Sequence, residues 1–99
     1  MKVNFSPAAQ ADLLDIALYI AQDSPTRALS FVDELEAKCL RLGQVSGIGT
    51  ARPELGDGLR VLPHGNYLIF YRDHESGLRI ERVMHGARDI GGDDFDADR

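Results

Sequence analysis

Cysteine is almost absent from this 99-residue chain, because Cys39 is its only one. A single thiol cannot form an internal disulfide, and it falls short of the Cys and His clusters that hold structural metal ions. The three histidines, His64, His74 and His85, do not form a His-x-x-x-His pattern. We therefore expect no disulfide, no metal site and no cofactor. Cys39 falls on an apolar helical stripe, which favours a buried core residue over a reactive thiol.

Long apolar runs are missing as well. No stretch approaches the roughly 18 to 20 residues that a membrane-spanning helix needs, and the N-terminus, MKVNFSPAAQ, lacks the apolar core of a signal peptide. The hydrophobic share of 43% is instead that of an ordinary globular protein. These features predict a single cytoplasmic domain that does not contact a membrane.

Lysine does not occur after Lys38, so every basic residue between positions 44 and 90 is an arginine. The net charge of −5 argues against indiscriminate binding of nucleic acid. The planar guanidinium, however, pairs bidentately with a carboxylate or a phosphate. The middle of the chain is therefore suited to an acidic partner. Its arginines are Arg52, Arg60, Arg72, Arg79, Arg82 and Arg88.

Two amphipathic helices are predicted after a short strand at KVNF. Ser6–Pro7 and Ser24–Pro25 each combine a good N-cap with a proline at the first helical position. Apolar residues then recur at helical spacing, and Gly43 suits a left-handed residue at the end of the second helix. The few residues between the helices indicate an antiparallel αα-hairpin. The two stripes are Leu13, Ile16, Ala17 and Ile20, and Ala28, Val32, Leu35, Cys39 and Leu42.

A glycine-rich loop over residues 44–58 precedes three strand patterns, LRVLP, YLIFYR and LRIERVMH, which are separated by turns. In the second pattern, Tyr67, Ile69 and Tyr71 point to one face, and the residues between them make the other face apolar too. Because two helices cover only one face of a small sheet, we expect the other face to await a partner. In the third pattern, alternation places Arg82 on the same strand face as apolar residues. The sequence therefore does not decide which face is in the core near the end of this strand.

Residues 91–99, GGDDFDADR, form an acidic tail behind a domain of residues 1–90. Its composition is typical of a mobile or loosely docked segment, and Phe95 would anchor it on the body of the protein or on a partner.

The segment RVMHGARDI, residues 82–90, resembles an active site. A ribonuclease that uses the 2′-OH of RNA as nucleophile needs an acid, a base and cations around the phosphate. His85 would be the acid or base, and Arg60, Arg82 and Arg88 would hold the phosphate. The alternative is structural, since a histidine at a strand end often only makes hydrogen bonds and Arg88–Asp89 is often a local ion pair.

Three stretches together resemble the RelE/ParE superfamily of bacterial toxins from type II toxin-antitoxin systems: SPAAQADLLDIALYIA, GLRVLPHGNYLIFYR and IERVMHGARDI. The resemblance covers residues 2–90 and is greatest to the ParE branch. It implies an α+β fold in which a short N-terminal strand and an antiparallel αα-hairpin pack on a small antiparallel β-sheet.

The resemblance also implies two possible activities. RelE-like members cut messenger RNA on the ribosome with a face rich in lysine and arginine and a tyrosine or histidine near the C-terminus. This chain keeps Arg60 and Arg88 but has no tyrosine after Arg88. ParE-like members inhibit DNA gyrase and are not expected to be enzymes, so RVMHGARDI would then hold structure or touch a protein.

A cognate ParD-like antitoxin is the implied partner, and the chain would meet DNA only indirectly, through that antitoxin. The antitoxin would wrap the αα-hairpin and the sheet, with its acidic and apolar tail meeting arginines and a free apolar face. The expected contacts are Arg52, Arg60, Tyr67, Ile69, Tyr71, Arg82 and Arg88. Two alternatives remain: a RelE-type ribonuclease with Arg60, His85 and Arg88 as catalytic residues, and a degenerate toxin that only binds its antitoxin and co-represses the operon.

Overall fold

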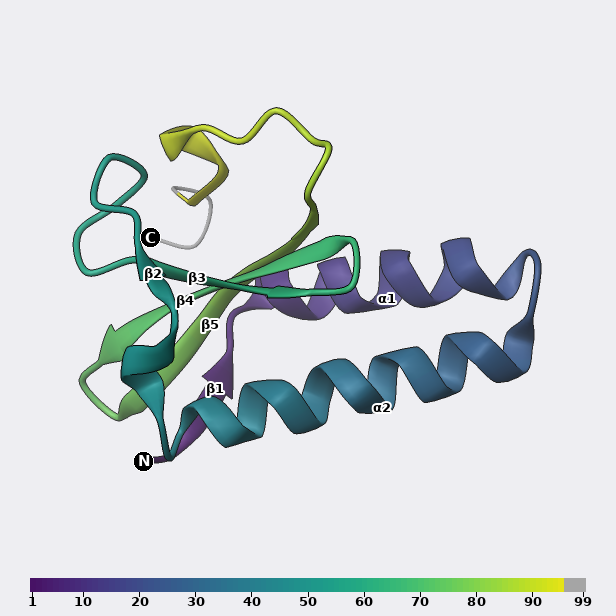
Figure 1. Cartoon of the computed structure of the whole chain (residues 1–99), viewed down its shortest axis with the longest axis horizontal. Helices are drawn as coiled ribbons and strands as arrows, with labels where there is room; N and C mark the ends of the chain where they lie inside the picture. The colour runs from purple at the N-terminus through teal and green to yellow at the C-terminus, as the bar shows by residue number, and fades with distance from the viewer. Residues whose placement is uncertain (96–99) are drawn as a thin grey trace.

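Two long helices pack on one face of a five-stranded sheet in the computed structural model, which describes residues 1–95. Helices α1 (Pro7–Ala21) and α2 (Pro25–Leu42) run antiparallel (Figure 1). The strands lie in the order β1-β5-β4-β3-β2. The predicted α+β fold is thus confirmed. The strands are β1 (Val3–Phe5), β2 (Thr50–Ala51), β3 (Arg60–His64), β4 (Tyr67–His74) and β5 (Gly77–His85).

Both helices begin where the sequence predicts. The Ser6 hydroxyl accepts a hydrogen bond from the backbone N–H of Ala9 at 2.9 Å, and the Ser24 hydroxyl accepts one from Arg27 at 3.1 Å. Each serine satisfies an N–H group that the first turn of a helix leaves without a partner, and the proline that follows has no N–H to satisfy.

The end of α2 differs from the prediction. Gly43 has a right-handed φ of −61°, so the expected left-handed residue is wrong. A Cβ atom at this position would lie 2.5 Å from the Met1 carbonyl oxygen and 2.7 Å from Cγ2 of Val3. Glycine is therefore required by the close approach of the N-terminal strand.

The sheet is mixed, whereas the sequence predicts an antiparallel one. Strands β2 to β5 pair antiparallel, but β1 lies parallel to β5 at the edge, with Val3 opposite Leu78 and Phe5 opposite Ile80. Parallel neighbours cannot be joined by a tight turn, and here the αα-hairpin and three strands lie between β1 and β5 along the chain. Gly65 and Gly77 have φ values of 58° and 135° in the two tight turns.

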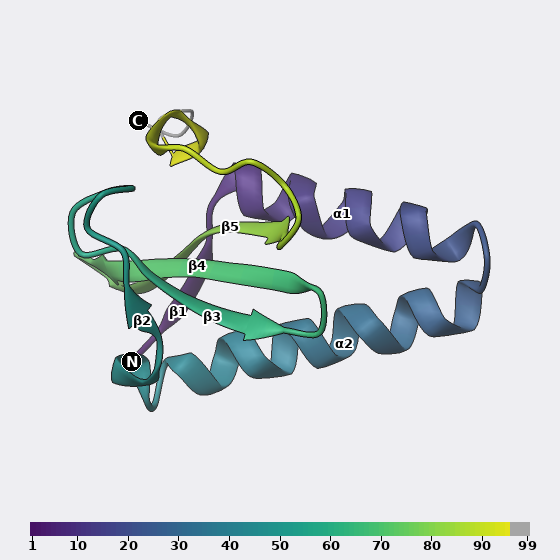
Figure 2. The same ribbon diagram turned by 45° about the horizontal axis from the view of Figure 1, so that its top comes forward.

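The two faces of the sheet are covered by different parts of the chain. The αα-hairpin covers one face, and the C-terminal segment lies on the other (Figure 2). The helix-side core is centred on Leu35, Ile69 and Ile80, each 0% exposed. A smaller cluster on the opposite face joins strands β3 to β5 to the loop before β3 and to the chain end. Its members are Leu59, Val61, Phe70, Met84 and Phe95, flanked by Leu55, Leu68 and Ile90.

A register shift in β5 decides which residues face the helices. Tyr71 of β4 pairs with Ile80, but the preceding Phe70 pairs with Arg82, so Glu81 is an extra residue. Such a β-bulge interrupts the two-residue alternation of a strand.

The bulge resolves the position of Arg82 that the sequence leaves open. Leu78, Ile80 and Val83 belong to the helix-side core, while Met84 belongs to the opposite cluster. Arg82, like Met84, therefore turns away from the face that Leu78 and Ile80 share.

Ser6, the N-cap of α1, and Asp12 of α1 bind the side of β5 where β1 stops. The Ser6 N–H donates to the Ile80 carbonyl at 2.9 Å, and the Ser6 hydroxyl donates to the Glu81 carbonyl at 2.7 Å. Farther along, the Val83 N–H donates to Oδ2 of Asp12 at 2.9 Å. These bonds satisfy backbone groups in the part of β5 that extends beyond β1 and would otherwise be open to another chain.

Two predicted irregular segments contain short elements. The loop over 44–58 holds the 3₁₀ helix η1 (Ser46–Ile48) and β2, and the tail holds the 3₁₀ helix η2 (Gly92–Phe95). Phe95 is 7% exposed and packs on the body of the protein, while residues 96–99 of the predicted tail lie outside the described residues. None of the helices in the described part of the chain is long and apolar enough to cross a membrane.

Candidate functional site

Arg82 is held at the junction of α1, β5 and η2. Its Nε and Nη2 donate to the two carboxylate oxygens of Asp12 at 2.7 and 2.8 Å, and Nη1 donates to the Asp94 carbonyl at 2.9 Å. The side chains of Arg82 and Asp12 are 15% and 11% exposed. A bidentate pair at this depth fixes the guanidinium, so Arg82 joins three elements rather than standing ready for a substrate.

His85 lies at the exposed end of β5. Its Nδ1 accepts a hydrogen bond from the Ala87 N–H at 3.1 Å, so in the neutral ring the proton is on Nε2. The ring meets Tyr67 edge-on, with 5.2 Å between centroids. His85 thus supports the turn that leaves β5.

Arg60 and Tyr71 hold the segment around η1. Nη1 of Arg60 donates to the Gly49 carbonyl at 2.7 Å, and the Tyr71 hydroxyl donates to the Ser46 carbonyl at 2.5 Å while accepting from the Gly49 N–H at 2.8 Å. Burial raises the pKa of the Tyr71 hydroxyl, which keeps it protonated as a donor. A side chain at Gly49 would collide with the tyrosine oxygen.

The three residues of the ribonuclease hypothesis do not converge. Arg60 pairs with Tyr71 and His85 with Tyr67, four positions apart along β4, which is about 13 Å of strand. Arg88 donates through Nη2 to Oδ1 of Asp94 at 2.7 Å, beside the cluster on the opposite face. Acid–base catalysis needs its groups within hydrogen-bonding reach of one reacting centre, and this arrangement separates them.

The free apolar face predicted from Tyr67, Ile69 and Tyr71 is wrong, because this is the face that the helices cover. Ile69 and Tyr71 are 0% and 1% exposed within the helix-side core, and only Tyr67 remains partly accessible. The other face of β4 carries Leu68 and Phe70, and the C-terminal segment lies against it. Both faces of β4 are apolar, so its sequence could not show which one the helices occupy.

The remaining predicted contact residues lie at the surface. Arg52 is paired with Oε2 of Glu54 at 2.5 Å and keeps 38% of its side chain exposed. Arg88 keeps 48% exposed in spite of its pairing with Asp94. Arg52 and Arg88 are thus the arginines of the predicted set that a partner reaches most directly.

An apolar groove on the outer side of the αα-hairpin is not among the predicted sites. It has a volume of about 360 Å³ and lies beside Leu18 and Leu29, which are 59% and 73% exposed. Leu14 and Leu18 lie four residues apart, outside the core stripe of α1, so counting them would have shown that this helix has a second apolar face. The groove is lined by Ala17, Leu18, Ala21, Pro25, Ala28, Leu29 and Val32.

A second hollow of about 430 Å³ opens where the tip of the hairpin meets the β3–β4 turn. The guanidinium of Arg27 lies 5.1 Å from the centre of the Phe31 ring on one side. Burial, followed by the nearby Tyr19, raises the pKa of the Tyr67 hydroxyl on the other. The hollow is lined by Tyr19, Ile20, Arg27, Phe31, Gly65, Asn66, Tyr67 and His85.

Residues suited to metal or nucleophilic chemistry are not assembled in the described part of the chain. No group of three His, Cys, Asp or Glu side chains among residues 1–95 is placed to hold a metal ion. Cys39 is 0% exposed, and burial raises the pKa of its thiol to about 12, so the thiolate needed for nucleophilic attack does not form near neutral pH.

Comparison with known proteins gives one family and several structures. The family model described as the ParE toxin of the type II toxin-antitoxin system parDE matches residues 3–90. A structure of the chromosomal ParDE TA system from P. aeruginosa is 26% identical with a TM-score of 0.71, over 86% of this chain and 95% of that one. The RelBE2 toxin-antitoxin complex from Mycobacterium tuberculosis is 24% identical with a TM-score of 0.53, over 85% and 95%, and shows similarity of fold alone. Comparison with curated proteins gives no match.

Proposed function

The chain belongs to the ParE toxin family of type II toxin-antitoxin systems, and on that premise we propose that it arrests growth by inhibiting DNA gyrase and is neutralised by a ParD-like antitoxin that binds it directly. It acts by binding and not as an enzyme. Toxin and antitoxin meet in the cytoplasm, and the toxin reaches operator DNA only through the antitoxin.

The observation that carries this proposal is the separation of Arg60, His85 and Arg88. Arg60 holds η1, His85 supports the turn after β5, and Arg88 is paired with Asp94. The net charge of −5 also gives RNA no attractive field. A binding mechanism needs neither a converged acid–base pair nor a cationic cleft.

The groove on the outer side of the hairpin favours an antitoxin helix as occupant. Its lining includes the small residues Ala17, Ala21 and Ala28, so a partner helix can approach closely and insert large apolar side chains. Peptide helices bind such grooves through anchors at positions i, i+3 or i+4, and i+7. The acidic part of the antitoxin then reaches Arg52, Arg88 and the hollow beside Tyr67.

The predicted contact set changes accordingly. Arg52, Tyr67 and Arg88 remain proposed contacts. Arg60 and Arg82 contribute through the elements that they hold, since Gly49 and Asp12 engage their guanidinium groups. The buried Ile69 and Tyr71 are not contacts, because an antitoxin cannot reach them without displacing the helices.

The gyrase proposal is tested with the purified full chain in a DNA supercoiling assay. We expect inhibition of supercoiling by gyrase and intact messenger RNA in cells during the first minutes of growth arrest. Rapid cleavage of translated messages that is abolished by His85→Ala would establish the RelE-type alternative instead. Normal growth of cells that express the chain without antitoxin would favour the degenerate, co-repressing toxin.

The antitoxin surface is tested with two leucines of equal exposure. Leu18 lines the groove, and Leu40 lies elsewhere on the hairpin with 58% exposure. Leu18→Lys should weaken binding of the cognate antitoxin by roughly tenfold or more, because it places a charge in an apolar contact. Leu40→Lys is the matched control. Equal effects of the two substitutions would place the antitoxin helix elsewhere.

A further inference from the structure

We propose that the sheet face opposite the helices is a binding site for an acidic partner segment in which an aromatic residue directly follows a carboxylate, and that the chain's own Asp94 and Phe95 occupy this site in cis. This face is distinct from the outer groove of the hairpin.

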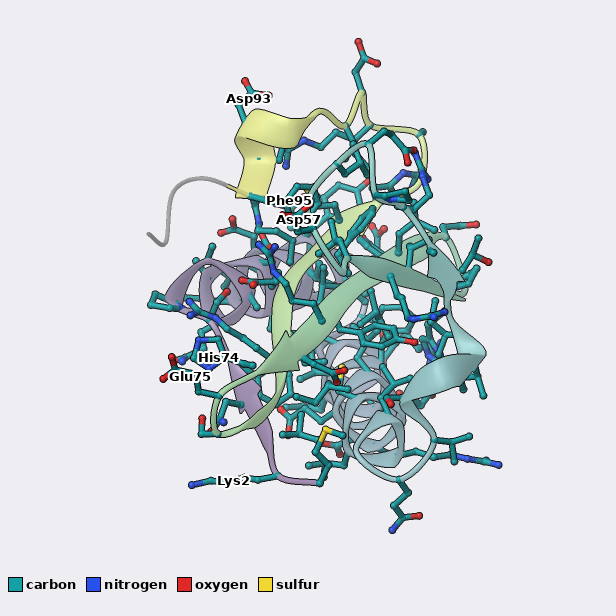
Figure 3. The ribbon with its side chains drawn as sticks, turned by 90° about the vertical axis from the view of Figure 1, so that its left-hand side faces the viewer. Lys2, Asp57, His74, Glu75, Asp93 and Phe95 are labelled. Carbon is teal, nitrogen blue, oxygen red and sulfur yellow. The ribbon has the colours of Figure 1, made fainter. Side chains whose placement is uncertain are left out.

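The apolar half of the site is formed by strands β3 to β5. Phe95 packs edge-on against Phe70, with 5.0 Å between ring centroids and 62° between the ring planes. Val61 and Met84 flank it in the same cluster. Figure 3 shows η2 above these strands, with Phe95 on the side of the sheet and Asp93 pointing outward. One aromatic side chain from the chain end thus covers an apolar area that the strands themselves create.

The polar half is formed by two arginines around Asp94. Nη2 of Arg88 donates to Oδ1 of Asp94 at 2.7 Å, and Nη1 of Arg82 donates to its backbone carbonyl at 2.9 Å and lies 4.0 Å from the same carboxylate oxygen. The Gly91 N–H donates to Oδ2 at 3.0 Å. The carboxylate and the carbonyl of Asp94 are therefore bound next to the apolar area that Phe95 covers.

Arg82 stays oriented without the C-terminal segment. Asp12 of α1 accepts hydrogen bonds from its Nε and Nη2, so Nη1 points to the site whether or not Asp94 is there. A donor that is already fixed loses little conformational freedom when a ligand binds, which favours affinity.

The segment in cis is suited to exchange. Its anchor is a single turn of 3₁₀ helix whose approach, residues 86–91, has no regular structure. Arg88, which holds the carboxylate, keeps 48% of its side chain exposed. An incoming segment can therefore replace the contacts of Asp94 and Phe95 one by one while β3 to β5 stay in place.

The chemistry of the site favours a peptide over a nucleic acid. A phosphate would pair with Arg82 and Arg88 but would leave the apolar area around Phe70 uncovered. The overall charge of −5 also disfavours a polyanion that brings no apolar contact. The arrangement found in cis, carboxylate and then aromatic ring, matches both halves of the site at once.

The test removes the side chains that occupy the site in the full chain and then adds the same segment as a separate peptide. Asp94→Ser and Phe95→Ala together remove the occupant, and a synthetic peptide with the sequence of residues 91–99, GGDDFDADR, is the probe. We expect the peptide to shift the NMR signals of Phe70, Met84 and the Arg82 Nε–H group in the vacated variant, with at least roughly tenfold tighter binding than to the unaltered chain. Added salt should weaken this binding because the paired charges are partly exposed.

Two matched peptides and two arginine variants sharpen the result. Replacing the second aspartate by asparagine, or the phenylalanine by alanine, should weaken binding roughly tenfold. Arg88→Ala in the vacated chain should do the same, and Arg27→Ala, on the far side of the molecule, should not. If the double variant does not fold, Phe95→Ala alone in the full chain serves with the same peptides. Absence of binding, binding that is insensitive to these changes, or tighter binding of a short oligonucleotide would each overturn the proposal.

Discussion

The two faces of the sheet are both apolar, but they are closed in different ways. The helix side is sealed by two long helices whose buried residues interlock with β4, β5 and β1. The opposite side is closed by a loop and a single turn near the chain end, with Phe95 packed against Phe70. The first closure is made by regular secondary structure and should open only when the protein unfolds. The second can open locally, because irregular segments with few contacts have low local stability.

A truncation in the helix-side core should have the largest effect. Leu35 is 0% exposed, and Leu35→Ala should lower the free energy of unfolding by about 4 kcal/mol, since it removes buried methyl groups and leaves a cavity that helices on a sheet cannot collapse. Denaturant titration followed by circular dichroism measures this change. Leu40→Ala, at a position that is 58% exposed, should change it by less than about 0.5 kcal/mol. Equal losses would contradict a core centred on Leu35.

The next largest loss of stability should come from the contact between α1 and β5, which lies between the two faces. Asp12 joins α1 to β5 and to Arg82, so Asp12→Ala should cost about 3 kcal/mol, because it removes two hydrogen bonds from a mostly buried guanidinium and one from the Val83 N–H. The loss is read from the denaturation midpoint. Combining it with Arg82→Met should recover part of the stability, because the mostly buried guanidinium that has lost Asp12 is removed as well. A double variant that is simply additive would show that the two residues do not interact.

The sequence predicts the fold where the determinants are local. Ser6–Pro7 and Ser24–Pro25 mark the helix starts because a cap bonds to an N–H only three residues ahead. The strand patterns likewise lie within one residue of β3 and β5. What escapes prediction depends on distant pairing. Asp12 occupies a polar slot in the helical pattern of α1, and its partner Arg82 lies 70 positions away.

The candidate site shows the same division. Arg82, His85 and Arg88 look like one constellation because they lie close along the chain. The bulge at Glu81 and the exit from β5 direct them to α1, to Tyr67 and to Asp94, respectively. A bulge is a property of two paired strands, so the alternation within a single strand does not reveal it.

Substitution of Tyr71, in the helix-side core, should have an intermediate effect on the free energy of unfolding. Tyr71→Phe keeps the ring but removes the hydroxyl that bonds to the Ser46 carbonyl and the Gly49 N–H, and it should cost about 2 kcal/mol. The same hydroxyl predicts a dependence on pH. Burial raises its pKa in the folded chain above the usual value of 10, so its contribution is complete below pH 10 and falls as the pH rises towards the folded pKa.

Alkaline denaturation measures this dependence. The unaltered chain should lose stability above pH 10 more steeply than Tyr71→Phe, because only its unfolded state releases the Tyr71 proton in that range. Tyr19→Phe, at a position that is 68% exposed, is the control and should leave the slope unchanged. Identical slopes for the unaltered chain and Tyr71→Phe would mean that the hydroxyl is not held as described.

The smallest effect should come from Phe95, and it separates the two faces most directly. Phe95→Ala removes a ring that is 7% exposed, but the chain end can settle onto the strands without leaving a fixed cavity, so the cost should stay near the transfer free energy of the side chain, about 1.5 kcal/mol. Amide hydrogen exchange should then accelerate at Gly91, whose N–H depends on Asp94, while the amides in the middle of α2 change only as far as the global stability does. An acceleration shared equally by Gly91 and α2 would show that both faces open as one unit. In that case the closure by η2 would belong to the same cooperative structure as the helices, and a partner could not displace it without unfolding the toxin.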